Sequence, residues 1–240
     1  MKNYLELYSE DAKNIKSYVS LSGKLQNQED ALRLIVPDLV QKLSLKPTDS
    51  LLDIGCNCGQ ITIPMSFLCK RVVGIDGGVI ARLRERITGI DNIFTIEGDF
   101  REVPIDEKFD CILIYSVLVY MDSYEEKLNF ILKAADLLKP GGRLLVGDVI
   151  NVSTKKRFEN SEYFCIVDEE YKKYKNKMSE DDKNKSQNHG PLLENILDDE
   201  MLMRLLLDIR RAGYESFILP QDKDMPFGYT RQDILVKSWK

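Results

Sequence analysis

The sequence of 240 residues lacks any apolar segment long enough to cross a bilayer. Its longest apolar run, Cys111 to Met121, has 11 residues and includes Ser116, whereas a membrane-spanning helix needs about 20 apolar residues. The first ten residues include Glu6 and Glu10, where a signal peptide would need a continuous apolar segment. We therefore expect a cytoplasmic protein without a membrane partner.

Histidine is also scarce, positive charge is not in excess, and the cysteines are few enough to bear on the class of protein. Five cysteines are ordinary usage, and their odd number argues against a disulfide framework. Cys56 and Cys58 are too close in sequence for the usual spacing of a zinc site, and there is only one histidine. The 34 Lys and Arg residues against 39 Asp and Glu give a net charge of −5, whereas nucleic-acid-binding domains are usually basic. We therefore expect neither a metal site nor a nucleic-acid partner.

What the chain does contain is an alternation of apolar runs and helical stretches. An apolar content of 43% supports a full core and excludes global disorder. Strands are predicted at residues 50–54, 71–76, 93–97, 109–116, 143–149, 214–219 and 233–237. The first five are apolar on both faces and separated by helices, which indicates a parallel sheet covered on both sides. The last two are joined by about 13 residues without a helical signal, so we expect them to pair antiparallel.

Two segments fall outside this alternation. Residues 1–45 are predicted to form an N-terminal helical cap, in which Pro37 kinks or divides a helix over Asn27–Leu43. The main domain covers residues 46–240 and carries a charged insertion at about 153–190. Between Asp168 and Lys185, 12 of 18 residues are charged, so we expect a solvated segment, either a helix or a mobile lid.

The most informative segment is a glycine-containing turn after the first predicted strand, Asp53-Ile54-Gly55-Cys56-Asn57-Cys58-Gly59. Asp76 ends the second strand, where a carboxylate can accept both hydroxyls of a ribose. Asp99 follows the third strand, where a carboxylate can receive an amino group such as adenine N6. The turn and both carboxylates lie at the carboxyl ends of parallel strands, where open α/β sheets bind ligands.

Two kinds of nucleotide ligand compete for this arrangement. A dinucleotide fold needs G-x-G-x-x-G to hold a pyrophosphate, whereas this chain has G-x-x-x-G, with Asn57 in place of the middle glycine. Asp53 stands two residues before Gly55, where a carboxylate would repel a pyrophosphate. Such a carboxylate suits a ligand with a cationic group, such as the ammonium of an amino acid.

In their order and spacing these motifs resemble those of the class I S-adenosylmethionine (SAM)-dependent methyltransferases. The resemblance rests on Asp53-x-Gly55-x-x-x-Gly59, Asp76, Gly98-Asp99, the strand through Ser116-Val117-Leu118, and Lys139-Pro140-Gly141-Gly142. It covers roughly residues 45–150 and 210–240, and the last strand, Asp233–Val236, matches the reversed seventh strand of that family. It implies an α/β fold with a Rossmann-like, seven-stranded, mostly parallel sheet, an antiparallel last strand and helices on both faces. Asn57 departs from the glycine of most members, but asparagine tolerates the left-handed conformation.

The same resemblance implies SAM as the cofactor and assigns residues to each part of it. Asp53 would hold the ammonium, directly or through water, and Ser116 would lie beside the methionine moiety. The remaining residues implied in cofactor binding are Gly55, Cys56, Asn57 and Gly59 in the loop, Asp76 at the ribose, and Gly77, Asp99 and Phe100 at the adenine. Ser116 also stands where magnesium-using members would carry a carboxylate, so no metal is implied.

Candidates for a general base are few. His189, in Asn188-His189-Gly190-Pro191, is the only histidine and the natural base at neutral pH, unless it is a solvent-exposed loop residue. Asp148 at the end of the fifth strand and Tyr120 after the fourth are expected at the mouth of the same cleft. Arg157 and Arg231 would either bind an anionic acceptor or lie on the surface.

Several C-terminal segments are also similar to methyltransferases linked to bacterial surface-polysaccharide biosynthesis, of capsule or flagellar glycan. They are Gly147–Ser153, Lys156–Phe158, Ala212–Tyr214, Leu219–Gln221, Met225-Pro226 and Arg231–Leu235. This similarity implies methyl transfer to a small-molecule acceptor, first of all an oxygen of a sugar or surface-glycan precursor, while carboxyl, phosphoryl and nitrogen acceptors stay open. The alternatives are an NAD(P)-dependent oxidoreductase and a non-catalytic SAM-binding protein.

Overall fold

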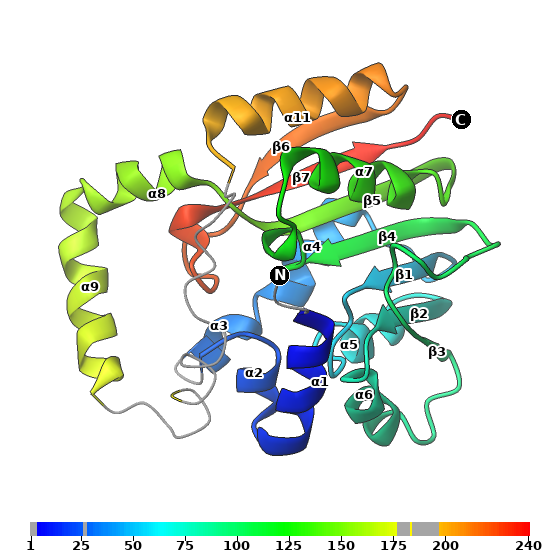
Figure 1. Cartoon of the computed structure of the whole chain (residues 1–240), viewed down its shortest axis with the longest axis horizontal. Helices are drawn as coiled ribbons and strands as arrows, with labels where there is room; N and C mark the ends of the chain where they lie inside the picture. The colour runs from blue at the N-terminus through cyan, green and yellow to red at the C-terminus, as the bar shows by residue number, and fades with distance from the viewer. Residues whose placement is uncertain (1–3, 26–27, 177–182, 184–196) are drawn as a thin grey trace.

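A computed structural model describes residues 4–25, 28–176, 183 and 197–240. Its centre is one seven-stranded sheet in the order β3-β2-β1-β4-β5-β7-β6 (Figure 1). The strands are β1 (Ser50–Ile54), β2 (Arg71–Asp76), β3 (Ile93–Glu97), β4 (Phe109–Tyr115), β5 (Leu138–Ile150), β6 (Glu215–Pro220) and β7 (Arg231–Lys237). Strands β1 to β5 are parallel, and β7 is antiparallel to both of its neighbours. The predicted fold class and the antiparallel pairing of the last two strands are confirmed.

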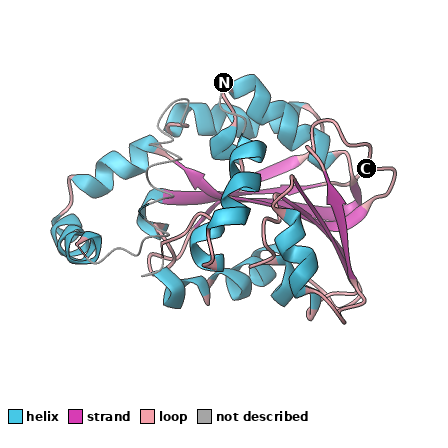
Figure 2. Ribbon diagram, turned by 60° about the horizontal axis from the view of Figure 1, so that its bottom comes forward, coloured by secondary structure: helices cyan, strands magenta, loops and turns pink. Residues whose placement is uncertain are grey.

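Helices cover both faces of this sheet (Figure 2). In chain order they are α1 (Tyr4–Asn14), α2 (Tyr18–Leu21), α3 (Glu29–Leu32), α4 (Ile35–Leu43), α5 (Thr62–Ser66), α6 (Ile80–Arg86), η2 (Leu118–Tyr120), α7 (Tyr124–Ala135), α8 (Val152–Glu159), α9 (Glu162–Lys175), α11 (Asp199–Arg211) and η3 (Gly228–Thr230). Successive strand residues point to opposite faces, so Leu51 packs in the cluster that includes α4 and α5, and Leu52 in the cluster that includes α7 and α11. Both leucines are fully buried, which explains why β1 carries apolar residues on both faces.

One expectation about these elements is confirmed, and the start of one strand differs. The helix expected over residues 27–43 is divided into α3 and α4, as predicted; the break precedes Pro37, which lies in the first turn of α4, where its missing N–H is not needed. Strand β5 begins at Leu138, before the predicted start at Arg143, because Leu138 already pairs with Phe109 of β4. The register shift between Phe109 and Cys111 accommodates the Pro140–Gly142 turn inside this pairing.

The order of the strands creates a place for a ligand at the carboxyl ends of the parallel strands. Strand β1 pairs with β2 on one side and with β4 on the other, so the crossovers from β1 to β2 and from β3 to β4 lead in opposite directions. Open α/β sheets bind ligands at such a reversal, outside the carboxyl ends of the strands. Helix α1 lies across this edge, and Leu5 faces Gly77, at which an added Cβ would lie 3.2 Å from Leu5.

Part of the predicted insertion forms helices α8 and α9, which project from the main body (Figure 1). Asn151 caps α8, because its side-chain oxygen accepts hydrogen bonds from the N–H groups of Ser153 and Thr154. Helix α8 has no buried residue. In the residues that the structure describes, no helix combines the length and the apolar character needed to cross a membrane.

Candidate active site

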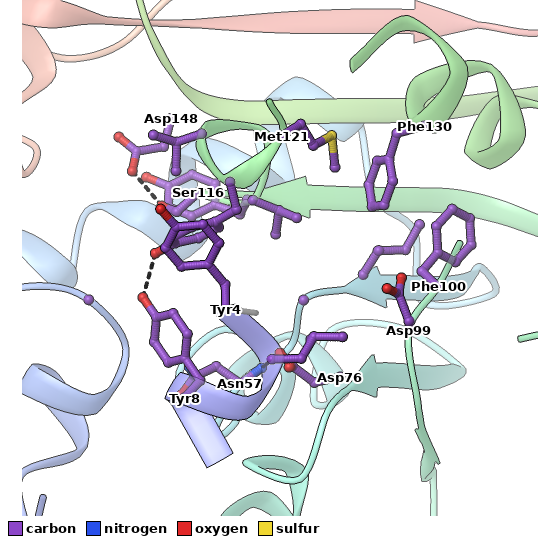
Figure 3. A pocket seen from close by; sticks show the side chains of 18 of the residues that line it. Tyr4, Tyr8, Asn57, Asp76, Asp99, Phe100, Ser116, Met121, Phe130 and Asp148 are labelled. Atoms are coloured by element: carbon purple, nitrogen blue, oxygen red, sulfur yellow. Dashed lines mark hydrogen bonds between the residues drawn. The ribbon is translucent and has the colours of Figure 1, made fainter. Parts of the chain in front are cut away.

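A cavity of about 580 Å³ lies at the carboxyl ends of β1, β2, β4 and β5 (Figure 3). Small-molecule sites commonly have volumes of about 300–1,000 Å³. The walls include Gly55 after β1, Asp76 at the end of β2, Ser116 after β4 and Asp148 near the end of β5. The cavity therefore lies at the edge of the sheet where the sequence predicted the ligand.

The glycine loop after β1 brings its backbone to the cavity wall at Gly55, because glycine has no side chain to fill that space. Gly55 has φ = +80°, and an added Cβ would lie 2.3 Å from Val117 Cγ2. Gly59 has φ = +83°, and an added Cβ would lie 2.4 Å from Leu83 Cδ1. Asn57 adopts φ = +49°, so the predicted left-handed asparagine is confirmed. The Asn57 side chain contributes further, since its Oδ1 accepts a hydrogen bond from the Cys58 N–H.

The Asp76 carboxylate lies in the cavity wall. Its Oδ2 accepts a hydrogen bond from the Asn57 N–H and its Oδ1 one from the Gly77 N–H, both at 2.7 Å. Removal from bulk water raises the pKa of Asp76 to about 6, because these two N–H groups only partly offset the desolvation. Among the described residues no lysine or arginine forms an ion pair with it. The carboxylate therefore retains the capacity to accept further hydrogen bonds from a ligand.

Asp99 and an apolar wall form the end of the cavity beyond β3. The Arg101 Nε lies 3.0 Å from one Asp99 oxygen and 2.9 Å from the other, and its Nη1 donates to Glu126 at 2.6 Å. Partial burial opposes ionisation of Asp99, but Arg101 holds its pKa below the usual value. The rings of Phe100 and Phe130 lie beside it with centroids 5.1 Å apart (Figure 3). An apolar slot with a carboxylate at its rim suits a planar base.

The opposite end of the cavity is polar and charged. Ser116 Oγ donates a hydrogen bond to Asp148 Oδ2 (Figure 3). Lys24 Nζ lies 2.5 Å from the same carboxylate oxygen and 3.1 Å from Ser116 Oγ. Arg231 Nε donates to Asp148 Oδ1 at 3.1 Å. Burial opposes ionisation of Asp148, yet Lys24 and Arg231 hold its pKa below the usual value, so it is an ionised and weak base.

Tyrosine side chains from the N-terminal cap contact η2 over the cavity. The Tyr4 ring lies 4.7 Å from the Tyr120 ring between centroids, and the Tyr8 ring lies 5.7 Å from it. The hydroxyls of Tyr8 and Tyr120 share a hydrogen bond. Burial raises the pKa of Tyr120 to about 12 and that of Tyr8 well above its usual value. Both phenols are therefore neutral at physiological pH and act as hydrogen-bonding groups rather than as bases.

Most of the predicted site residues meet in this one cavity. Those that line it are Gly55, Asn57, Asp76, Asp99, Phe100, Ser116, Tyr120 and Asp148. Four others, Asp53, Cys56, Gly59 and Gly77, are not part of the wall. The buried Asp53 carboxylate instead accepts a hydrogen bond from Thr62 Oγ1 at 2.6 Å. A contact between Asp53 and a ligand's ammonium, as predicted, would have to run through another group.

The remaining predicted residues have different positions. His189 lies outside the described residues. Arg157 is on the surface, where its side chain is 61% exposed and paired with Asp199. Arg231, in contrast, is in the cavity wall. Within the part of the chain that the structure describes, no group of three or more His, Cys, Asp or Glu residues is arranged to hold a metal ion.

Lys24 and Phe227 are wall residues that sequence analysis missed. Lys24 belongs to a polar segment without a recognisable motif, and it lies 124 positions from its partner Asp148. Phe227 lies in a loop and adopts φ = +59°. No local pattern marks either position, because only the fold brings these segments together.

Comparison with known proteins finds methyltransferases among the relatives of this chain. The sequence model of the Nodulation protein S (NodS) family matches residues 38–158 of the chain. Nodulation protein S of Sinorhizobium fredii is 28% identical over 116 residues, which are 48% of this chain and 54% of that protein. The ubiquinone biosynthesis O-methyltransferase of Chelativorans is 34% identical over 110 residues, which are 43% of this chain and 42% of that protein. The chain thus matches about half the length of these curated relatives or less.

A solved structure extends the similarity of the fold to the whole chain. The N-methyltransferase NodS of Bradyrhizobium japonicum, in complex with S-adenosyl-L-homocysteine (SAH), superposes with a TM-score of 0.62 and covers 100% of both chains. The sequence identity is 17%, so this likeness concerns the fold.

Proposed function

The chain belongs to the nodulation protein S (NodS) family, and from this premise we propose that it transfers the methyl group of SAM to a small-molecule acceptor. At the level of the family, the predictions of a class I SAM-dependent methyltransferase and of SAM as its cofactor are confirmed. One observation carries the proposal for this chain. The glycine loop, Asp76 and Asp99 surround one part of the cavity, and that cavity continues past Ser116 to a second, charged part.

The residues of the first part fit SAM. Asp76 presents a carboxylate without a cationic partner among the described residues, as a ribose diol requires. Asp99 and the rings of Phe100 and Phe130 offer a rim acceptor and an apolar wall to an adenine. Gly55 leaves space where a Cβ would meet Val117. When bound, SAM supplies a methyl group activated by its sulfonium charge.

The contribution of the protein to such a reaction is mainly positioning. Holding two reactants in an aligned geometry can provide roughly 7–11 kcal/mol of the barrier. Tyr4, Tyr8 and Tyr120 cover the cavity with aromatic rings, which limits water around the reacting atoms. Asp148 and Tyr120, both predicted as candidate bases, are poor proton acceptors at neutral pH. We therefore propose that they orient the acceptor and its neighbours.

We propose that the acceptor is a sugar or surface-glycan precursor. The atom that receives the methyl group is either a hydroxyl oxygen or an amino nitrogen. A hydroxyl oxygen is the sequence-based prediction, and the hydrogen-bonding groups at the far end of the cavity support a hydroxylated ligand. An amino nitrogen is the second candidate. It is supported by the N-methyltransferase activity in the name of the Bradyrhizobium NodS structure and by the weak bases described above, since a neutral amine needs no base to become nucleophilic.

A matched panel of acceptors tests this function. We expect the purified protein and methyl-labelled SAM to methylate at least one compound among free sugars, amino sugars and nucleotide-sugars. Tandem mass spectrometry then locates the methyl group on oxygen or nitrogen. SAH binding without methylation of any compound in a broad acceptor pool would support a non-catalytic SAM-binding protein. In a binding assay, an affinity of the protein for NAD(P) without any affinity for SAH would favour the oxidoreductase alternative.

The affinity for SAH is expected to rise as the pH rises from about 5 to 7. Ribose hydroxyls donate to the ionised carboxylate, so ligand binding favours the deprotonated form of Asp76. In the free protein the pKa of this group is raised to about 6, so protonation competes with the ligand below that pH and ceases to compete above it. Calorimetry across this range measures the change. An Asp76→Asn variant should show a much flatter profile, and an equally steep one would assign the titration to another group.

A further inference from the structure

The charged end of the cavity contains an arginine whose hydrogen-bonding capacity is only partly used. Strand β7 is antiparallel to β5, so its first residue, Arg231, lies at the edge where β5 ends and pairs with Ile150. The Arg231 side chain lines the cavity and is 16% exposed. In the order of the strands, Asp76 and Asp99 lie at β2 and β3, on one side of β1 and β4, and Arg231 lies at β7, on the other side.

Two contacts fix the orientation of the Arg231 guanidinium. Its Nε donates to Asp148 Oδ1 at 3.1 Å, and its Cζ lies 5.3 Å from the centre of the Phe227 ring. Neither terminal amino group donates a hydrogen bond to any described residue. Arg157 has no such free edge, because Nη1 and Nη2 both donate to Asp199. A guanidinium held in this way presents the two parallel donors that match a carboxylate or phosphoryl group.

The charges around Arg231 also favour an anion. Lys24, Asp148 and Arg231 line this end of the cavity, so two cations face one carboxylate. Behind Asp148, the Asp233 carboxylate accepts a hydrogen bond from the Asp148 N–H and is paired with Lys42 at 2.7 Å. Asp233 is fully buried and is not part of the cavity wall. Lys42 also pairs with Asp38 at 2.6 Å, so the wider cluster holds three cations and three carboxylates, and the excess of positive charge is confined to the residues that line the cavity.

We propose that this end of the cavity is a subsite for an oxoanion carried by the acceptor, either a carboxylate or a phosphoryl group. Arg231 binds two of its oxygens, Lys24 contributes positive charge, and Asp148 holds both cations in place. The inference rests on the proposed function and narrows its acceptor to an anionic molecule, such as a uronic acid or a sugar phosphate.

Calorimetry on the full chain saturated with SAH tests the subsite. The probes are glucuronate, glucose 6-phosphate, inorganic phosphate and neutral glucose. We expect at least one anionic probe to bind about tenfold or more tightly than glucose, since one charge-assisted bidentate contact supports such a ratio. A preference for glucuronate identifies a carboxylate subsite, and a preference for either phosphate probe identifies a phosphoryl subsite.

Variants at the two arginines assign the preference. Arg231→Gln should abolish it, Arg231→Lys should retain part of it, and the surface variant Arg157→Gln should leave it unchanged. SAH affinity should stay within about threefold of wild type in all three, which also shows that they fold. Equal binding of all probes by the wild-type protein, or a preference that survives Arg231→Gln, would overturn the subsite.

A separate comparison distinguishes this subsite from the cofactor's own carboxylate. If Arg231→Gln and Arg231→Lys weaken SAH about tenfold but leave 5′-methylthioadenosine, which lacks the amino-acid part, unaffected, then Arg231 serves the cofactor and the proposal is wrong. A wild-type protein that does not bind SAH at all would contradict the proposed function itself, and the subsite with it. Normal SAH binding without anion preference would contradict the subsite alone.

Discussion

Replacement of Asp76 by alanine is expected to lower the affinity for SAM by about tenfold or more. The change removes a carboxylate that can accept hydrogen bonds from a ribose, and a hydrogen bond to a charged group contributes about 1.5–3 kcal/mol. A difference of 1.4 kcal/mol is a factor of about ten in the dissociation constant. Calorimetry with SAM or SAH measures the loss, and the far-ultraviolet circular dichroism spectrum checks that the variant is folded.

Glu107→Ala is a matched control for Asp76→Ala. Glu107 is a partly exposed carboxylate that pairs with Arg71 outside the cavity. Its removal changes the net charge of the protein equally and should leave SAM affinity unchanged. Equal affinities of the Asp76→Ala variant and the wild type would show that Asp76 does not contact the cofactor. That result would remove the strongest support for the proposal that this end of the cavity binds SAM.

Gly55→Ala is expected to impair both the fold and the cofactor site. Gly55 has φ = +80°, a conformation that costs an L-residue roughly 1–2 kcal/mol. The new Cβ would also lie 2.3 Å from Val117 Cγ2, and overpacking of this kind costs about 1–3 kcal/mol. The new methyl group would push the Val117 side chain aside. Gly55 and Val117 both line the cavity, so the shape of the cavity changes, and we expect SAM affinity to fall about tenfold or more.

Gly141→Ala separates the two causes. Gly141 has a similar φ of +77°, but an added Cβ there would meet no atom of the described residues within 4 Å. This variant should therefore lose only the backbone part of the stability and keep normal SAM affinity. Urea unfolding gives the free energy of unfolding for both variants. If the two glycine variants behave alike in unfolding and in SAM binding, the close approach to Val117 has no functional weight.

The involvement of Lys24 in the site gives the N-terminal cap a role beyond covering the sheet. Lys24 follows α2, and its Nζ contacts residues that follow or belong to β4 and β5. The Tyr8 hydroxyl of α1 contacts Tyr120 of η2 in the same cavity. The cap thus supplies Lys24 to the charged end of the cavity, and its Leu5, beside Gly77, lines the end that we propose for the cofactor.

The sequence by itself determined the sheet and the place of the end of the cavity that we propose for the cofactor. Apolar runs predicted the strands because burial leaves a local pattern in each of them, which is strongest in the inner strands β1, β2, β4 and β5, where both faces are covered. The shared position of Asp76 and Asp99 in one cavity could be predicted because each lies at the carboxyl end of its own strand, and the carboxyl ends of parallel strands share one edge of the sheet. Asn57 was predicted correctly for a local reason, since the turn needs a residue that tolerates positive φ.

Only the tertiary structure decided the acceptor end. Its charged cluster joins Lys24 after α2, Asp148 in β5 and Arg231 at the start of β7, and no periodicity or spacing relates three such distant positions. The sequence could not separate Arg231 from Arg157 either, because neither arginine belongs to a motif that shows whether its side chain is buried. Burial and pairing separated them: the first is enclosed beside Phe227 with a free edge, and the second is exposed and saturated by Asp199. The environment of a charged side chain, which sets what it can bind, arises only when remote segments pack together.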